Sequence, residues 1–290
     1  MEHGRIGKWK LVNRTLGYGV RTLVMGILNV TPDSFSDGGR FFDTTLAIRR
    51  AEKMLEEGAD IIDIGGESTR PGASQVPEDE EIRRVAPVIR KLAIETGAII
   101  SVDTTKASVA AAAINEGAEI INDISGLRFD PAMGRVAASA GAGLVLMHSR
   151  GTAETMHRLE PANEVIDEVI DGLHHSITEA RESEVCAESI AVDPGIGFGK
   201  SVEQNLQLLT DLSLIAREFS EYPLVLGTSR KRFIGRLLGD LPTDDRLAGT
   251  MATVTAAVLN GADIVRVHDV WSAVQTVRVA DALKRRSSAD

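Results

Sequence analysis

Short apolar, β-branched runs alternate with longer segments whose apolar residues recur at helical spacing. Segments 46–59, 79–98, 106–118 and 246–262 have this spacing and close on Gly-Ala, a glycine stop typical of a helix that turns back into a sheet. Runs of this length between such helices predict strands. Eight of them occur, at residues 23–31, 60–66, 98–104, 119–125, 143–149, 189–195, 223–229 and 263–269.

Strands that alternate with helices imply parallel pairing and right-handed crossovers, and eight units in 290 residues predict an α/β (β/α)₈ TIM barrel. A doubly wound open sheet is the second choice. Before the first unit, residues 9–23 resemble two short strands around a turn. We therefore expect a single domain over residues 1–290, in which residues 1–22 form an N-terminal β-hairpin that covers the bottom of the barrel.

Composition narrows the class of protein. The formal net charge is −10 without an extended basic tract, which disfavours nucleic acid and anionic membranes as partners. No run approaches the roughly 20 apolar residues of a membrane span, and the first residues lack the apolar region of a secretory signal. The lone Cys186 fits a reducing compartment. We expect a soluble, cytoplasmic protein.

Each apolar run ends in polar or glycine residues. In a parallel barrel the carboxyl ends of the strands form the catalytic mouth, so side chains that are distant in the sequence should meet there. A single polar strand end would mean little, because polar residues also begin helices. The predicted ring of strand-end residues is Asn29, Asp63, Asp103, Asn122, His148, Asp193, Ser229 and His268.

These strand ends divide into two chemical groups. Asp103, Asn122 and Asp193 interrupt apolar runs, where a carboxylate or amide is costly unless it is paired. Helix caps or hydrogen bonds inside the barrel would explain each one alone, whereas three together favour a planar ligand rich in donors. The second group indicates a phosphate site near strands seven and eight and comprises Arg70, Arg230, Lys231, Arg266 and His268.

Long glycine-bearing segments follow the first two strands, at residues 29–43 and 65–80. Their length and composition predict mobile loops that close over an anionic substrate, with Arg70 as part of the clamp. The segment DPGIGFGK at residues 193–200 lacks the spacing of a nucleotide-binding phosphate loop.

The motifs MGILNVTPDSFSDGG, DIGGESTRPG, SVDTTK, INDISG, MHSRGT, DPGIGFGK, GTSRKRFIG and RVHDV occur in order from about residue 23 to residue 270. Together they resemble the dihydropteroate synthase family of pterin-binding enzymes. The resemblance implies condensation of 6-hydroxymethyl-7,8-dihydropterin diphosphate with p-aminobenzoate, which gives 7,8-dihydropteroate and pyrophosphate in folate biosynthesis. It also implies Mg²⁺ as cofactor and a homodimer as the assembly.

The resemblance also assigns roles to residues of this chain. Those implied as catalytic are Arg70, Asp103, Lys231, Arg266 and His268, and the residue implied near the metal is Asn29. Contacts to the pterin fall to Asp103, Asn122, Asp193 and Lys231; those to the diphosphate fall to Asn29, Arg70, Arg266 and His268. The aminobenzoate and sulfonamide site is bordered by Thr69, Pro71, Phe198 and Ser229, and the substrate-binding set also includes Met147.

The implied chemistry needs no nucleophilic serine or cysteine, because the aromatic amine attacks directly and the protein supplies positioning and charge. Two rivals remain at this point. A methyltransferase acting on methyltetrahydrofolate and a corrinoid protein would need the pterin residues but not the anion clamp. A catalytically silent paralogue would bind pterin alone. The loop after MHS, residues 149–154, departs from the usual family pattern.

Overall fold

The computed structural model describes residues 6–31, 40–68, 75–151, 155 and 163–287, of which the side chains of 40–43 and 287 are excluded. An antiparallel hairpin precedes an eight-stranded parallel sheet. The eight predicted runs all form strands of this sheet. The strands are β1 Gly7–Lys10 and β2 Thr15–Tyr18 in the hairpin, then β3 Leu23–Asn29, β4 Ile61–Gly65, β5 Ile99–Asp103, β6 Ile120–Asp123, β7 Gly143–Met147, β8 Ile190–Asp193, β9 Val225–Leu226 and β10 Ile264–Val267.

The sheet closes on itself. Its strand order is β8-β7-β6-β5-β4-β3-β10-β9, and a parallel bridge between Val192 and Leu224 joins the two ends. The Val192 amide also donates to the Pro223 carbonyl at 3.0 Å. This closure confirms the (β/α)₈ barrel and excludes the open sheet.

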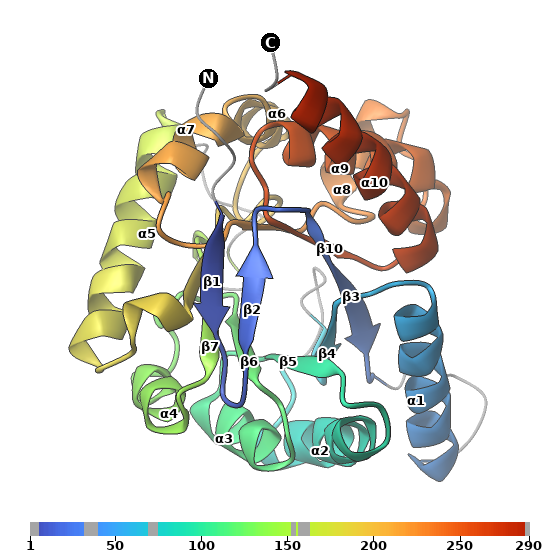
Figure 1. Cartoon of the computed structure of the whole chain (residues 1–290), viewed down its shortest axis with the longest axis vertical. Coiled ribbons are helices and arrows are strands. Elements are labelled where there is room, and N and C mark those ends of the chain that lie inside the picture. The colour runs from blue at the N-terminus through green and yellow to red at the C-terminus, as the bar shows by residue number, and fades with distance from the viewer. Residues whose placement is uncertain (1–5, 32–39, 69–74, 152–154, 156–162, 288–290) are drawn as a thin grey trace.

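Helices follow the barrel strands and surround the ring in Figure 1. They are α1 Arg40–Glu56, α2 Glu78–Thr96, α3 Ala107–Asn115, α4 Met133–Ala140, α5 Val165–Glu182, α6 Val202–Thr210, α7 Leu212–Glu218, α8 Arg232–Leu237, α9 Leu247–Leu259 and α10 Val270–Ser287, with short 3₁₀ turns η2 Ala187–Ser189 and η3 Thr243–Asp245. In the described residues, none is long and apolar enough to cross a membrane.

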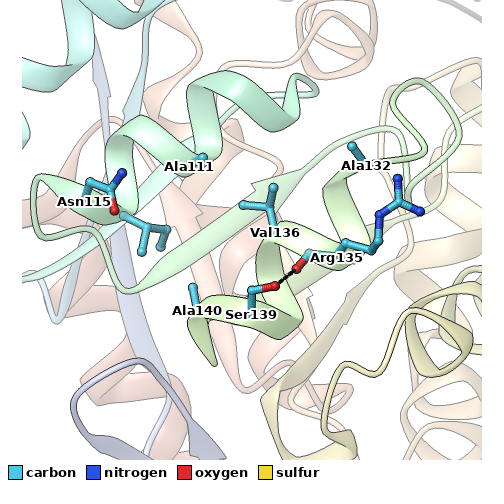
Figure 2. A pocket seen from close by; sticks show the side chains of 8 residues that line it. Ala111, Asn115, Ala132, Arg135, Val136, Ser139 and Ala140 are labelled. Atoms are coloured by element: carbon cyan, nitrogen blue, oxygen red, sulfur yellow. Dashed lines mark hydrogen bonds between the residues drawn. The ribbon is translucent and has the colours of Figure 1, made fainter.

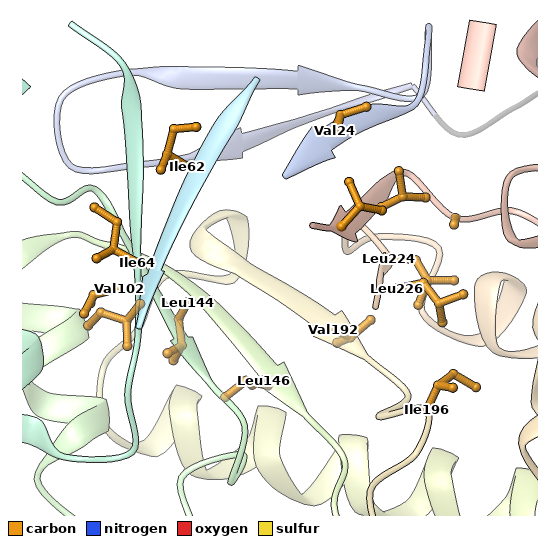
Figure 3. Packing of buried hydrophobic residues seen from close by; sticks show 14 of the residues in the cluster. Val24, Ile62, Ile64, Val102, Leu144, Leu146, Val192, Ile196, Leu224 and Leu226 are labelled. Atoms are coloured by element: carbon orange, nitrogen blue, oxygen red, sulfur yellow. The ribbon is translucent and has the colours of Figure 1, made fainter. Parts of the chain in front are cut away.

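The main core lies between the strands and the helices. Because successive side chains of a strand point to opposite faces, every second strand residue packs outward. Ile62 and Ile64 of β4, for example, belong to one buried cluster with Val85 and Ile89 of α2. Figure 3 shows part of this layer.

The hairpin closes the bottom of the barrel. Its Trp9 and Leu11 form a second buried cluster with residues of the barrel interior such as Met25, Ile61 and Val145. The indole Nε1 of Trp9 donates to the Ser189 carbonyl at 2.8 Å, so the polar atom of the buried ring is satisfied. In Figure 1 the hairpin lies across the ring of strands. The mouth at the opposite end is formed by the carboxyl ends of the strands.

Candidate active site

A polar layer lies above the apolar bottom of the barrel. Ile61 and Ile120 belong to the bottom cluster, and two residues further along the same strands come Asp63 and Asn122. The period of two places these residues on the same inner face of the barrel, nearer the mouth. The layer therefore sits where barrels of this kind hold their ligands.

Arg266 joins two carboxylates inside this layer. Its Nε donates to Asp63 Oδ2 at 2.6 Å and its Nη2 donates to Asp103 Oδ2 at 2.5 Å. Asn122 Nδ2 donates to the same Asp63 oxygen at 3.2 Å. Asp63 is fully buried, and its second oxygen, Oδ1, has no hydrogen-bond partner among the described residues. A buried acceptor without a donor is a point where a ligand N–H group would be stabilised.

One carboxyl group of the layer has a pKa close to neutral pH. Burial raises the pKa of Asp103 to about 7, and the nearby Arg266 opposes this rise. Burial acts to lower the pKa of Arg266, but Asp63 and Asp103 outweigh it, so the pKa is raised and the guanidinium stays charged. The site thus holds one permanent cation and one carboxyl group that titrates in the physiological range.

Asp193 and Lys231 stand near the glycine-rich loop after β8. Asp193 Oδ1 accepts a bond from the Gly195 amide at 2.7 Å, and burial raises the pKa of its carboxyl group against the pull of Lys231. The Lys231 ammonium donates to the Ile196 carbonyl and lies 4.6 Å from the centroid of the Phe198 ring. Burial lowers the pKa of Lys231 to about 8. These contacts combine a cation, a carboxyl group and an aromatic wall.

The anion-seeking side chains lie around the last strands. His268 Nδ1 lies 3.0 Å from Ser229 Oγ, and the His268 amide donates to the same hydroxyl at 3.1 Å. Arg230 is held by both oxygens of Asp269, at 2.9 and 2.7 Å, so its charge is already balanced within the protein. The left-handed φ of 58° at Arg230 makes a sharp turn between Ser229 and Lys231.

Asn29 ends β3 beside the polar layer. A Cβ atom at Gly65 would lie 3.7 Å from Asn29 Oδ1 and 3.8 Å from Asp103 Oδ2, so both oxygens flank the same glycine. An amide oxygen is a hard donor that suits Mg²⁺, which commonly uses one or two protein ligands together with substrate phosphates. The described residues contain no group of three or more His, Cys, Asp or Glu side chains placed to hold a metal by themselves. The donors present thus fit a metal that is held largely by the substrate.

The structure brings together most of the predicted site residues, with one exception and one change of grouping. The exception is His148, whose ring lies outside the barrel against α5, where a Cβ atom at Gly172 would be 2.5 Å from it. Arg266 stands among the carboxylates, whereas the sequence placed it with the anion-seeking residues. Met147 pairs with Asp193 in the register of β7 and β8, which puts it in the same layer. Thr69, Arg70 and Pro71 lie outside the described residues. The roles of the individual residues stay predictions.

Sequence reasoning missed two residues of the site. The strand-end pattern includes Asp63 but assigns it no role, although a carboxylate between isoleucines in IIDIG is the same signal that indicates Asp103. Lys200, at the end of DPGIGFGK, carries no motif signal of its own. Its ammonium donates to the carbonyls of Gly195 at 2.9 Å, Phe198 at 3.2 Å and His148 at 3.4 Å. It therefore fixes the loop that carries Phe198.

A shallow groove of about 560 Å³ lies outside the barrel, between α3 and α4 (Figure 2). Small apolar side chains such as Ala111 and Val136 line it. The Ser139 hydroxyl bonds to the Arg135 carbonyl at 2.7 Å within its own helix, so it is not turned to a ligand. None of the predicted site residues lines this groove. The candidate active site is therefore the barrel mouth.

Known proteins match both the barrel and the motifs. The family model described as "Pterin binding enzyme" matches residues 25–268. The dihydropteroate synthase of Bacillus subtilis is 48% identical over 92% of this chain and 90% of that protein. The Xanthomonas albilineans dihydropteroate synthase with 4-aminobenzoic acid has a TM-score of 0.88 and 41% identity, with 96% of this chain and 99% of that chain covered. The Burkholderia cenocepacia enzyme complexed with 7,8-dihydropteroate has a TM-score of 0.86 and 39% identity, with 98% and 99% covered.

The chain therefore belongs to the pterin-binding enzyme family and, within it, to the dihydropteroate synthases, the transferases of folate biosynthesis.

Proposed function

We propose that this protein condenses 6-hydroxymethyl-7,8-dihydropterin diphosphate with p-aminobenzoate to give 7,8-dihydropteroate and pyrophosphate. The observation that carries the proposal is the buried polar layer, in which Asp63, Asp103 and Asn122 gather around Arg266. A pterin presents several N–H donors on one planar edge, and carboxylate and amide oxygens are the matching acceptors.

The pterin ring lies in the layer with its donor edge toward Asp103, Asn122 and Asp193. Lys231 approaches from the side of the β8 loop, where its ammonium already covers the Phe198 ring. Because the site is buried, these carboxylates also stabilise positive charge that develops on the pterin methylene. The same residues therefore bind the substrate and lower the barrier.

The diphosphate lies toward the last strands, within reach of Asn29, Arg70, Arg266 and His268. Ser229 supports this placement because its hydroxyl bonds both the ring and the amide of His268, which fixes the imidazole. Asn29 would hold Mg²⁺, and the bound ion would supply positive charge that neutralises the diphosphate. Arginine and histidine contribute donors to the same oxygens.

The reaction is a direct displacement at the methylene carbon. The bond between this carbon and the bridging oxygen breaks, and its electron pair leaves with pyrophosphate. The lone pair of the aminobenzoate nitrogen forms the new C–N bond, and the nitrogen then releases a proton to solvent water. Thr69, Pro71, Phe198 and Ser229 border the aminobenzoate. Catalysis rests on positioning and charge, which can lower a barrier of this kind by several kcal/mol.

The test is pyrophosphate release in a mixture of the protein, the dihydropterin diphosphate, p-aminobenzoate and Mg²⁺, with each component omitted in turn. Release that needs every component supports the synthase and the cofactor. Pterin binding without release would instead indicate the silent paralogue, and methyl transfer from methyltetrahydrofolate would indicate the methyltransferase. Replacing Arg70 with alanine should lower turnover more than pterin affinity, because the arginine is assigned to the leaving group.

The proposal also covers the oligomeric state of the protein and its location in the cell. Large apolar side chains are exposed on α9 and α10, among them Leu259 at 43%, Trp271 at 61% and Val279 at 62%. Large apolar side chains that are exposed on a folded protein are commonly covered by a partner, and a second copy of the same chain is the usual one. We assign a homodimer. An exposed, unpaired Cys186 supports work in the reducing cytoplasm.

A further inference from the structure

One lysine bonds to groups on both sides of the segment that carries Arg70. Lys106 lies between β5 and α3. Its ammonium donates to the side chain of Glu67 and, at 2.9 Å, to the main-chain carbonyl of Val76. Glu67 precedes and Val76 follows residues 69–74, which lie outside the described residues. The two described ends of this segment are therefore held by a single cation.

A buried carboxylate holds the lysine in place. Lys106 also donates to Glu81 Oε2 at 2.5 Å, and the Glu81 side chain is only 1% exposed. The other oxygen of Glu81, Oε1, has no partner among the described residues, so its charge depends on the ammonium. Burial acts to lower the pKa of Lys106, but the hydrogen bonds that its ammonium donates to Glu67 and Glu81 outweigh it and raise the pKa. Lys106 thus stays charged at neutral pH.

The start of the segment is also packed against this pair. A Cβ atom at Gly66 would lie 2.9 Å from Glu81 Cγ, so the backbone of Gly66 lies directly on the glutamate. Arg84 Nη1 of the same helix, α2, donates to the Gly66 carbonyl at 2.9 Å. Little room is left for Glu81 to shift if its cation is removed.

We infer that Lys106 is a positioning residue for the reaction: by tying Glu67 and Val76 to the buried Glu81, it fixes where the segment that carries Arg70 leaves and rejoins the barrel. The inference rests on the proposed function. Lys106 comes three residues after Asp103, the last residue of β5. The ends of the segment are therefore anchored close in the chain to the carboxylate that is assigned to the pterin. An exposed ion pair would contribute little. This one is partly buried and includes a main-chain carbonyl.

Kinetics separate positioning from a general loss of structure. Lys106→Met should lower kcat for pyrophosphate release by about tenfold or more, because small displacements of charged groups are costly to catalysis. Affinity for 6-hydroxymethyl-7,8-dihydropterin, which lacks the diphosphate, should change by less than about twofold, because its pterin contacts remain. Lys106→Arg should recover most of the turnover, since a guanidinium can pair with both carboxylates.

Matched variants and a second measurement complete the test. Lys91→Met is the control, because Lys91 pairs with Glu95 at 3.9 Å on the exposed face of α2. Glu67→Gln keeps the Lys106–Glu81 pair and replaces Lys106→Met as the test variant if Lys106→Met does not fold. It should also lower kcat and leave the affinity for the pterin unchanged. We call Lys106→Met and Glu67→Gln the anchor variants. Amide hydrogen exchange over residues 64–77 should accelerate in those that fold and should not accelerate in Lys91→Met.

Three outcomes would overturn the inference: unchanged kcat in the anchor variants, an equal loss of kcat and pterin affinity, or unchanged exchange. Failure of the proposed function would give a different result from failure of this inference. If the wild-type protein releases no pyrophosphate, the exchange measurement still decides whether Lys106 anchors the segment.

Discussion

Arg266 of β10 and Asp63 of β4 form an ion pair inside the barrel, with the arginine Nε 2.6 Å from the aspartate Oδ2. The aspartate is fully buried, so the arginine is its charge partner as well as a ligand contact. Arg266→Met should destabilise the protein by about 3–5 kcal/mol, because it leaves Asp63 buried without a cation. Urea unfolding at neutral pH measures this loss. Arg83→Met, which breaks the exposed pair of Arg83 and Glu80 on α2, should cost less than about 1 kcal/mol; equal losses would contradict the assignment.

Binding of the pterin should depend on the protonation of Asp103. Its pKa of about 7 means that the group is neutral in acid and charged in base. Because the ligand edge consists of donors, affinity for the dihydropterin should fall by up to about tenfold for each pH unit below 7 and level off above it. Calorimetric titration across this range tests the trend. Asp103→Asn should bind the dihydropterin more weakly, and its affinity should not fall further below pH 7. If the fall in affinity below pH 7 is unchanged in this variant, another group is responsible for it.

The same pKa predicts how stability depends on pH. The folded pKa lies above the unfolded value, so the folded state binds more protons between the two. The contribution of Asp103 is therefore fully present in acid and is lost as the pH rises through about 7. Asp103→Asn should gain stability relative to the wild type when the pH is raised from about 5 to 8. Urea unfolding at the two pH values measures the difference, and a constant difference would refute the shift.

The hairpin should stabilise the barrel without taking part in catalysis. Trp9 is completely buried and packs against interior residues at the end opposite the mouth. Trp9→Ala should cost about 3–5 kcal/mol, because it leaves a cavity and removes the bond to Ser189. In the temperature range where the variant remains folded, kcat and KM should match the wild type. A selective loss of turnover in that range would mean that the bottom of the barrel influences the site.

Trp271 should contribute to the interface of the proposed dimer. Its side chain is 61% exposed on α10, the helix that also exposes Val279 and Leu283. Trp271→Glu would place a charge in the buried interface and should shift the protein to a monomer in light scattering after size exclusion. A charge change at the exposed Lys8 of the hairpin provides a control. A wild-type monomer at micromolar concentration would contradict the dimer.

The sequence predicted the barrel, its hairpin and the convergence of most strand-end residues because these follow from local periodicity, but it wrongly included His148, whose ring packs against Gly172 of α5. Each apolar run ends at a polar residue, and parallel pairing brings those ends to one rim. What it could not predict were partners across the interior. Arg266 contacts Asp103, which is 163 residues away and on a strand that is not its neighbour. Lys106 and Glu81 meet only after α2 has packed. Such pairs depend on how elements that are distant in the sequence pack together, which a strand pattern does not encode.

The most direct test of the account is a crystal structure with the dihydropterin substrate bound. We predict that the donor edge of the pterin lies within about 3 Å of carboxylate or amide oxygens of Asp103, Asn122 and Asp193, the usual hydrogen-bond distance. The diphosphate should then point toward His268 and Asn29. A pterin bound elsewhere, for instance in the groove between α3 and α4, would contradict the assignment of the polar layer as the active site.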